Sequence, residues 1–117
     1  MIKSIGLLTR KDGLSHADFV KHWYEIHAPL AHAVRGVRRY VQSHIQGERT
    51  RPDIPTTDVE IDGIAELWYD DREAMERANA TPEAKRLHAD GALFIGRIKS
   101  FIVEERVIIP VGPEPAR

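Results

Sequence analysis

Residues 37–45, Val-Arg-Arg-Tyr-Val-Gln-Ser-His-Ile, and residues 61–69, Ile-Asp-Gly-Ile-Ala-Glu-Leu-Trp-Tyr, decide the fold. Both segments are rich in β-branched and aromatic residues, which predicts two strands. The polar segment 46–60 between them contains two prolines and is longer than most hairpin loops, a type of connection that tends to be functional or to wrap a partner. Two successive strands without a helix between them restrict the fold to a few classes, which the flanking segments distinguish.

The segment before this pair predicts a strand and then a helix. Residues 2–9 are largely apolar and end at the turn Lys11-Asp12-Gly13, which predicts the first strand. Ser15 then begins a capping pattern. The apolar residues that follow have helical spacing and are Phe19, Trp23, Ile26, Leu30 and Val34. Pro29 predicts a kink or break near residue 28 and a second helical piece that Gly36 ends.

The segment after the pair predicts a further helical region and a last strand. Asp70-Asp71 caps a helix, Thr81-Pro82 restarts it, and it is expected to run to about Gly91. A strand follows over residues 98–107. The resulting order is that of an α+β, ferredoxin-like βαββαβ fold, an antiparallel four-stranded sheet with helices on one face. Since both faces of the strands carry apolar residues, we expect a homodimer that packs sheet against sheet.

Composition excludes several classes of function. The 117 residues include 17 Lys and Arg and 18 Asp and Glu, so the formal net charge of −1 argues against nucleic acid and against a polybasic membrane surface as partners. The chain contains no cysteine, which excludes thiolate nucleophiles and cysteine-bound metals. The sequence contains no apolar run long enough to span a bilayer and no signal-peptide pattern, so we expect a cytoplasmic protein.

The six histidines, at positions 16, 22, 27, 32, 44 and 88, do not have metal-binding spacing. His22 and His27 are five residues apart, as are His27 and His32, and such residues point about 140° apart on an α-helix. We therefore expect no metal and no other cofactor. His22 is expected to have a solvated role.

His27 has two interpretations. It lies at the edge of the apolar stripe, so it is either a buried neutral imidazole bonded to a backbone carbonyl or a general acid/base. Tyr40, Gln42 and His44 alternate along the sequence and so share one strand face. This face is an exposed edge, a dimer contact or a set of polar groups aimed into a cavity. Glu66 lies between apolar neighbours. Its carboxylate is either paired with an arginine, or buried with a raised pKa. The large aromatic residues fit either a core or the walls of a pocket and are Trp23, Trp68 and Phe94.

Several spaced segments resemble the EthD-like family. The first half contributes Lys11-Asp12-Gly13-Leu14-Ser15 and then Phe19, His22-Trp23 and His27-Ala28-Pro29-Leu30. The second half contributes residues 62–69, then Thr81-Pro82-Glu83, Asp90 and Phe94. The resemblance covers residues 2–107, so the predicted domain is 1–107, and 108–117 is an extension expected to pack at the dimer interface.

The resemblance implies a fold and a range of activities. The family takes its name from an ether-degradation gene cluster and belongs to the dimeric α+β barrel superfamily, which includes methylisomerases, cyclases, dehydratases and cofactor-free monooxygenases. In methylisomerase-like members a helical histidine and a tyrosine at the start of the second strand lie in the pocket, and His27 and Tyr40 match them.

The sequence thus leaves three hypotheses. The first is a small cofactor-independent enzyme that acts by proton transfer on a lactone, phenolic or polyketide-like molecule. In it His27 and Tyr40 are catalytic, Trp23, Trp68 and Phe94 line the pocket, and His44 or Glu66 orients the substrate. The second is a binding or accessory protein for a hydrophobic or aromatic small molecule. The third is a structural partner of another enzyme. A cavity beside His27 would favour the first two over the third.

Overall fold

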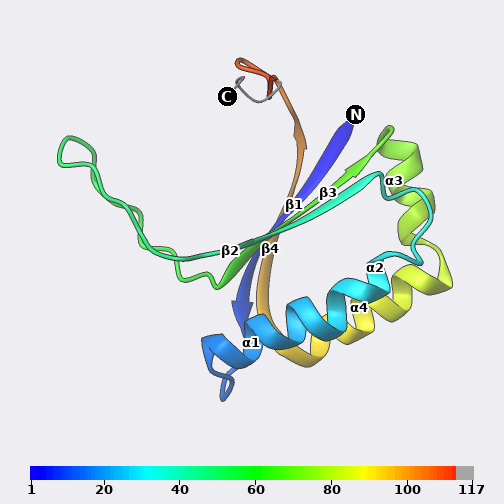
Figure 1. The fold of residues 1–117 in the computed structure, drawn as a ribbon, viewed down its shortest axis with the longest axis horizontal. Coiled ribbons are helices and arrows are strands. Elements are labelled where there is room, and N and C mark those ends of the chain that lie inside the picture. The colour runs from blue at the N-terminus through cyan, green and yellow to red at the C-terminus, as the bar shows by residue number, and fades with distance from the viewer. Residues whose placement is uncertain (113–117) are drawn as a thin grey trace, which may run out of the picture.

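A computed structural model describes residues 1–112 of the chain as one four-stranded sheet with helices (Figure 1). The strands are β1 (Ile2–Arg10), β2 (Arg39–His44), β3 (Gly63–Tyr69) and β4 (Ile95–Glu104). The helices are α1 (His16–His22), the π-helix η1 (Trp23–His27), α2 (Ala28–Ala31), α3 (Arg72–Asn79) and α4 (Pro82–Phe94). The order confirms the predicted α+β class and its βαββαβ pattern.

The sheet has the strand order β2-β3-β1-β4, and every neighbouring pair is antiparallel. Figure 1 shows the helices gathered on one face of this sheet. Tyr40 lies opposite Leu67, and Ser4 lies opposite the same residue on the other side. Because directly paired residues point to the same face, the register places these side chains together on one face, and this is the face that the helices cover.

Local sequence signals explain where the helices begin. The side chains of Ser15, Asp71 and Thr81 accept hydrogen bonds from the backbone N–H three residues later, so each caps a helix as predicted. Several ends differ from expectation, and β4 ends at Glu104 rather than at residue 107. The helical segment ends at Ala31 rather than Gly36, and β4 begins at Ile95, directly after α4, so it lies three residues earlier than the predicted strand.

The predicted break before Pro29 takes the form of a π-helix. In η1 the N–H of Ala28 donates to the carbonyl of Trp23, five residues earlier. Pro29 has no N–H to continue the α-helical ladder, so this longer turn leads into α2. A π-turn inside a helix changes which side chains share a face, and π-turns occur frequently at functional sites.

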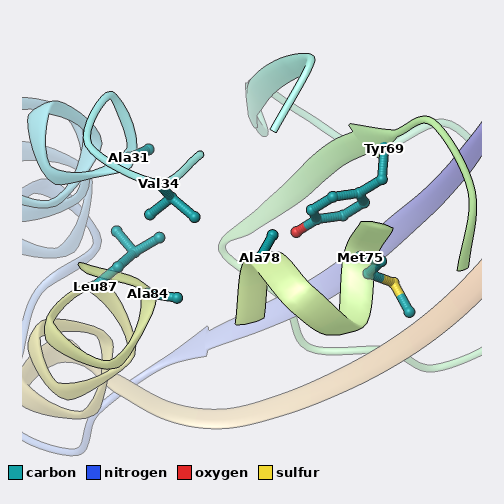
Figure 2. Close-up of a cluster of buried hydrophobic side chains, with 7 residues drawn as sticks. All are labelled: Ala31, Val34, Tyr69, Met75, Ala78, Ala84 and Leu87. Carbon is teal, nitrogen blue, oxygen red and sulfur yellow. The ribbon is translucent and has the colours of Figure 1, made fainter. Parts of the chain in front are cut away.

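The core consists of two clusters between the helices and the sheet. One cluster packs α2, α3 and α4 on the end of β3 and contains Ala31, Val34, Tyr69, Met75, Ala78, Ala84 and Leu87 (Figure 2). The other lies under α1, η1 and α4 and contains Leu8, Phe19, Trp23 and Phe94. The three largest fully buried side chains all belong to the second cluster, which therefore fixes the helix that carries His27.

The opposite face of the sheet has no helix over it in the described chain, and the segment between β2 and β3 extends away from the sheet (Figure 1). The side chains after β4 project outward, with exposed fractions of 71% at Val107 and 87% at Ile108 and Ile109. Residues 113–117 of the predicted extension lie outside the described residues. No described helix has the length and apolarity needed to cross a membrane.

Candidate active site

A cavity of about 670 Å³ lies between the helices and the sheet. Both core clusters contribute to its walls, Trp23 and Leu8 from one and Tyr69 and Leu87 from the other. His27 and Tyr40, the two candidate catalytic residues, both line it. The remaining walls are mainly apolar, so the cavity fits a hydrophobic molecule that carries few polar groups.

Asp90 of α4 connects His27 to His22. His27 Nδ1 lies 2.8 Å from Asp90 Oδ2, and His22 Nε2 lies 3.1 Å from each oxygen of the same carboxylate. A carboxylate only accepts hydrogen bonds, so the proton of neutral His27 is on Nδ1. The other ring nitrogen, Nε2, then has a free lone pair and is the basic atom.

The prediction that His22 and His27 point apart is wrong, and η1 is the reason. Residues five apart diverge on an α-helix, but a π-turn places them close to one face. Both imidazoles consequently reach Asp90, and the His22 side chain is only 24% exposed rather than solvated. His22 also stacks on Phe94, with 4.5 Å between the ring centroids.

Burial holds His27 in its neutral form. The residue is 9% exposed, and this burial lowers its pKa below the ordinary value of 6.5, although the hydrogen bond to Asp90 acts in the opposite direction. His27 Nε2 has no hydrogen-bond partner in the described chain. Trp23 Nε1 is the only described side-chain nitrogen or oxygen that both lacks a partner and is fully enclosed, so His27 Nε2 is not fully enclosed. His27 Nε2 thus keeps open space beside it on the cavity side.

Hydrogen bonds fix the direction of the Tyr40 hydroxyl. Gln42 Nε2 lies 2.9 Å from the carbonyl oxygen of Trp23, which can only accept, so the Gln42 amide points its NH₂ group there. The same nitrogen lies 2.9 Å from Tyr40 Oη and donates to it. Since Tyr40 Oη accepts from Gln42, the hydroxyl proton is free for an acceptor in the cavity.

His44 completes this network from the far side. Its Nε2 lies 2.9 Å from Gln42 Oε1, and because that oxygen accepts, His44 Nε2 carries the proton. The His44 ring also stacks on Trp23, with 4.8 Å between centroids. His44 lines a neighbouring hollow of about 710 Å³, which shares Val34, Val37 and Tyr40 with the cavity of His27, but it does not line that cavity itself. It supports Gln42 and Trp23 rather than facing a molecule in the cavity.

Burial raises the pKa of the Tyr40 phenol above 10.0, and the hydrogen bond from Gln42 offsets only part of that effect. Tyr40 therefore stays protonated and acts as a hydrogen-bond donor at neutral pH. In an apolar cavity such a donor interacts strongly with a developing negative charge on oxygen.

The predicted pocket aromatics have different positions. Trp23 is fully buried and lines the cavity, and its ring fits only because residue 63 is glycine: a Cβ there would lie 2.4 Å from the indole. Phe94 is 1% exposed and packs edge-on against His27 at 5.1 Å, behind the histidine rather than on the cavity wall. It holds the imidazole in place.

Glu66 and Trp68 do not join the cavity, which corrects their predicted place in the pocket. Both point to the opposite face of the sheet, because β3 side chains alternate and Ala65 and Leu67 face the helices. Glu66 binds Lys3 Nζ at 2.7 Å, and the Trp68 ring lies between Lys3 and Arg39. Glu66 is thus paired, with a lysine instead of the arginine considered from sequence.

Two residues of this region were assigned no role from sequence. Asp90 lies in α4 between Leu87 and Phe94, so a carboxylate on the buried stripe of that helix is the signal that predicts it. Tyr69 lines the cavity at the end of β3 and had no such signal, since aromatic residues are common in strands whichever way they face.

Across residues 1–112, no group of three or more histidine or acidic side chains has a metal-binding arrangement.

Comparison with known proteins identifies the family of this chain and a relative of known activity. Residues 11–98 match the family model of the EthD domain. The chain is 30% identical over 108 residues to 4-carboxymethyl-4-methylbutenolide mutase of Pseudomonas reinekei. The match covers 92% of this chain and 100% of that protein.

Solved structures agree with the fold. An ethyl tert-butyl ether D (EthD) family protein from Bacillus halodurans superposes with a TM-score of 0.74 at 28% identity, covering 91% of this chain and 99% of the other. A dimeric ferredoxin-like protein of unknown function from Thermobifida fusca superposes with a TM-score of 0.66 at 15% identity, over 87% and 88%. At that identity the second match concerns the fold alone.

Proposed function

Because the chain belongs to the EthD domain family, we propose that it is an enzyme that isomerises or otherwise rearranges a small oxygenated molecule by proton transfer. The substrate class is a lactone, phenolic or polyketide-like compound. The observation that carries the proposal is the pair of oriented groups at one cavity: a neutral His27 whose free Nε2 is basic, and a Tyr40 hydroxyl whose proton is free to donate. The mutase activity of the Pseudomonas reinekei relative supports the same class of chemistry.

The proposed step is a proton shift next to a carbonyl group. His27 Nε2 takes a proton from a carbon adjacent to the carbonyl, so a C–H bond breaks and an N–H bond forms. The electron pair moves onto the carbonyl oxygen, where the Tyr40 hydroxyl stabilises the enolate. In a substrate with a C=C bond beside the deprotonated carbon, this enolate is a dienolate, and the protonated His27 returns the proton to its distal carbon. The C=C bond shifts, and the product is an isomer. No electron acceptor is needed.

Asp90 and Gln42 make this step feasible without touching the substrate. Asp90 stabilises the imidazolium that forms on His27, and Gln42 keeps the Tyr40 proton directed at the substrate oxygen. A positioned acid/base of this kind typically contributes about 10²- to 10⁴-fold in rate.

Proton exchange with solvent tests the proposal directly. Butenolides with and without a carboxymethyl substituent are incubated with the protein in D₂O, and NMR follows deuterium uptake beside the carbonyl. We expect uptake or isomerisation that His27→Ala abolishes and Tyr40→Phe reduces, with both variants folded by circular dichroism. Recovery of every compound undeuterated and unchanged would contradict an enzyme, and tight binding without exchange would identify a binding protein.

We also propose that the chain forms a homodimer through the sheet face that the helices leave open. That face carries partly exposed apolar residues, among them Ile5, Leu7, Val41, Ile64 and Phe101. A patch of this kind on a small domain is characteristic of an interaction surface. The Thermobifida fusca neighbour is dimeric, which supports a dimer for this chain.

Sedimentation tests the dimer. A single chain has a mass of 13.3 kDa, so a species of about twice that mass is expected at micromolar concentration. Ile64→Glu should shift the equilibrium to the monomer, whereas Ile26→Glu, at an exposed position on the helical side, should not. A wild-type monomer at micromolar concentration would contradict the proposal.

A further inference from the structure

The Tyr69 hydroxyl is a polar group of the cavity that the proposed proton shift does not use. Tyr69 lies at the end of β3, is only 3% exposed and lines the same cavity as His27 and Tyr40. Figure 2 shows its hydroxyl pointing away from the strand, toward the side of the cluster where Val34 and Leu87 lie. Burial raises the pKa of this phenol above 10.0, so it stays protonated.

No described residue satisfies this hydroxyl. Tyr69 Oη makes no hydrogen bond within residues 1–112, and burial is the single cause of its pKa shift. The Tyr69 hydroxyl is also not fully enclosed. In that range, Trp23 Nε1 is the only side-chain nitrogen or oxygen that is fully enclosed and lacks a partner. A buried donor without a partner costs about 1–3 kcal/mol unless something in the adjoining space accepts from it. Its natural acceptor is a molecule in the cavity.

Tyr69 and Tyr40 lie at different points of the cavity wall, although both pack on the same core cluster. Tyr40 pairs with Leu67 across β2 and β3, and its hydroxyl is turned toward Gln42, which pairs with Ala65. Tyr69 lies two residues beyond Leu67 in the other direction, among the side chains of α3. The two phenols therefore offer donors at two separate points along a mainly apolar wall.

The charge of the lining restricts what these donors can bind. None of the described residues around the cavity is a lysine or an arginine. The lining groups that can become cationic are His88 and His27, and burial keeps His27 neutral. A carboxylate would therefore find no permanently charged partner, which is energetically costly, whereas a hydroxyl or carbonyl needs only one donor. The cavity is therefore suited to neutral oxygen functions at both points.

We propose that Tyr69 is a second substrate-binding residue, and that the substrate is a largely apolar, neutral molecule with two separate oxygen functions. Tyr40 binds the oxygen at the reacting end, and Tyr69 binds the distal one. This rests on the proposed function only in assigning the reacting end to His27 and Tyr40.

Binding of a matched set of probes tests the inference without any turnover. Isothermal titration calorimetry compares flavanone, which has a ketone end, with 4′-hydroxyflavanone, which adds a distal hydroxyl, and with 4′-carboxyflavanone. We expect 4′-hydroxyflavanone to bind about 2- to 10-fold more tightly than flavanone, the value of one hydrogen bond. The carboxylate should bind most weakly of the three.

Tyr69→Phe should abolish the preference for the distal hydroxyl while flavanone affinity stays unchanged. The variant should unfold at the same or a higher temperature than wild type, since no partner of Oη is lost. Tyr24→Phe, an exposed tyrosine outside the cavity, is the control and should keep the preference. Equal affinities in wild type, a preference that survives Tyr69→Phe, tightest binding of the carboxylate, or no binding of any probe would overturn the inference. If 4′-hydroxyflavanone is preferred but the D₂O experiment shows no deuterium uptake, the role of Tyr69 stands and only the proposed function is refuted.

Discussion

His27 Nδ1 lies 2.8 Å from Asp90 Oδ2, across the interface between η1 and α4. These residues are 63 positions apart in the chain, so their contact forms only when the helices pack together. The contact determines the tautomer of His27, the direction of its free nitrogen and the stability of its protonated form. The chemistry proposed for the cavity depends on it.

Asp90→Asn tests this contact. An asparagine can offer its NH₂ group to His27 Nδ1, which favours the tautomer with the proton on Nε2, the atom that must act as base. We expect turnover to fall by about 10²- to 10⁴-fold with substrate affinity little changed. Steady-state kinetics measure the effect. Glu83→Gln, on the outer side of α4, is the matched control, and an Asp90→Asn enzyme with wild-type kcat would contradict the role.

The pH profile follows from the two pKa directions. His27 must be neutral to act as base, and burial lowers its pKa, so the acid limb of kcat/KM should lie below 6.5. Tyr40 must be protonated, and burial raises its pKa, so the alkaline limb should lie above 10.0. Because Asp90 raises the pKa of His27, Asp90→Asn should move the acid limb lower still. An acid limb at or above 6.5 would show that His27 does not control the rate.

Gln42→Leu removes the donor that orients Tyr40. Tyr40 Oη then loses its bond from Gln42 Nε2, and the phenol proton can turn away from the cavity. We expect kcat to fall about 10-fold or more, and the alkaline limb to move upward because Gln42 lowers the pKa of Tyr40. Gln46→Leu, on the exposed segment after β2, should change neither. A drop in kcat with an unmoved alkaline limb would indicate a general loss of packing.

Gly63→Ala tests the placement of the Trp23 ring. The new Cβ would lie 2.4 and 2.7 Å from two indole carbons, so the ring must shift into the cavity or the strand must move. Overpacking of this kind costs about 1–3 kcal/mol. Gly91→Ala is the control, since its Cβ would meet its nearest neighbours at 3.5 and 3.6 Å, an ordinary contact distance. Thermal unfolding of both variants should show a loss only for Gly63→Ala.

Asp62→Asn tests a buried carboxylate outside the cavity. Asp62 is 4% exposed, and this burial by itself would raise the pKa of its carboxyl group. Hydrogen bonds from Arg10 and His16 outweigh burial, so the pKa lies below 3.8. A carboxyl with a lowered pKa stabilises the fold above pH 3.8, and that contribution is lost as the pH falls through the folded-state pKa. We expect a loss of about 1–3 kcal/mol at pH 7.

The difference between wild type and Asp62→Asn should shrink as the pH falls below 3.8. Denaturant unfolding at several pH values measures it, with Asp12→Asn, an exposed turn residue, as the control. A difference that is constant with pH would mean that the charge of Asp62 contributes nothing.

Several features of the site were predictable because they depend on neighbours in sequence. The caps at Ser15 and Thr81 and the break before Pro29 are local, and so is the alternation that places Tyr40, Gln42 and His44 on one strand face. The π-turn was not predictable, because Pro29 indicates an interruption without specifying its form. That turn is what brings His22 and His27 to a single carboxylate.

The sequence by itself determined the order of the elements, the family and the candidate pair His27 and Tyr40. The tertiary structure decided which sheet face the helices cover, and thus that Tyr69 enters the cavity while Glu66 and Trp68 do not. The physical reason is that strand alternation has a period of two and is the same whichever face is buried. Only the packing of η1 and α4 on the sheet breaks that symmetry, and the same packing brings Asp90 to His27.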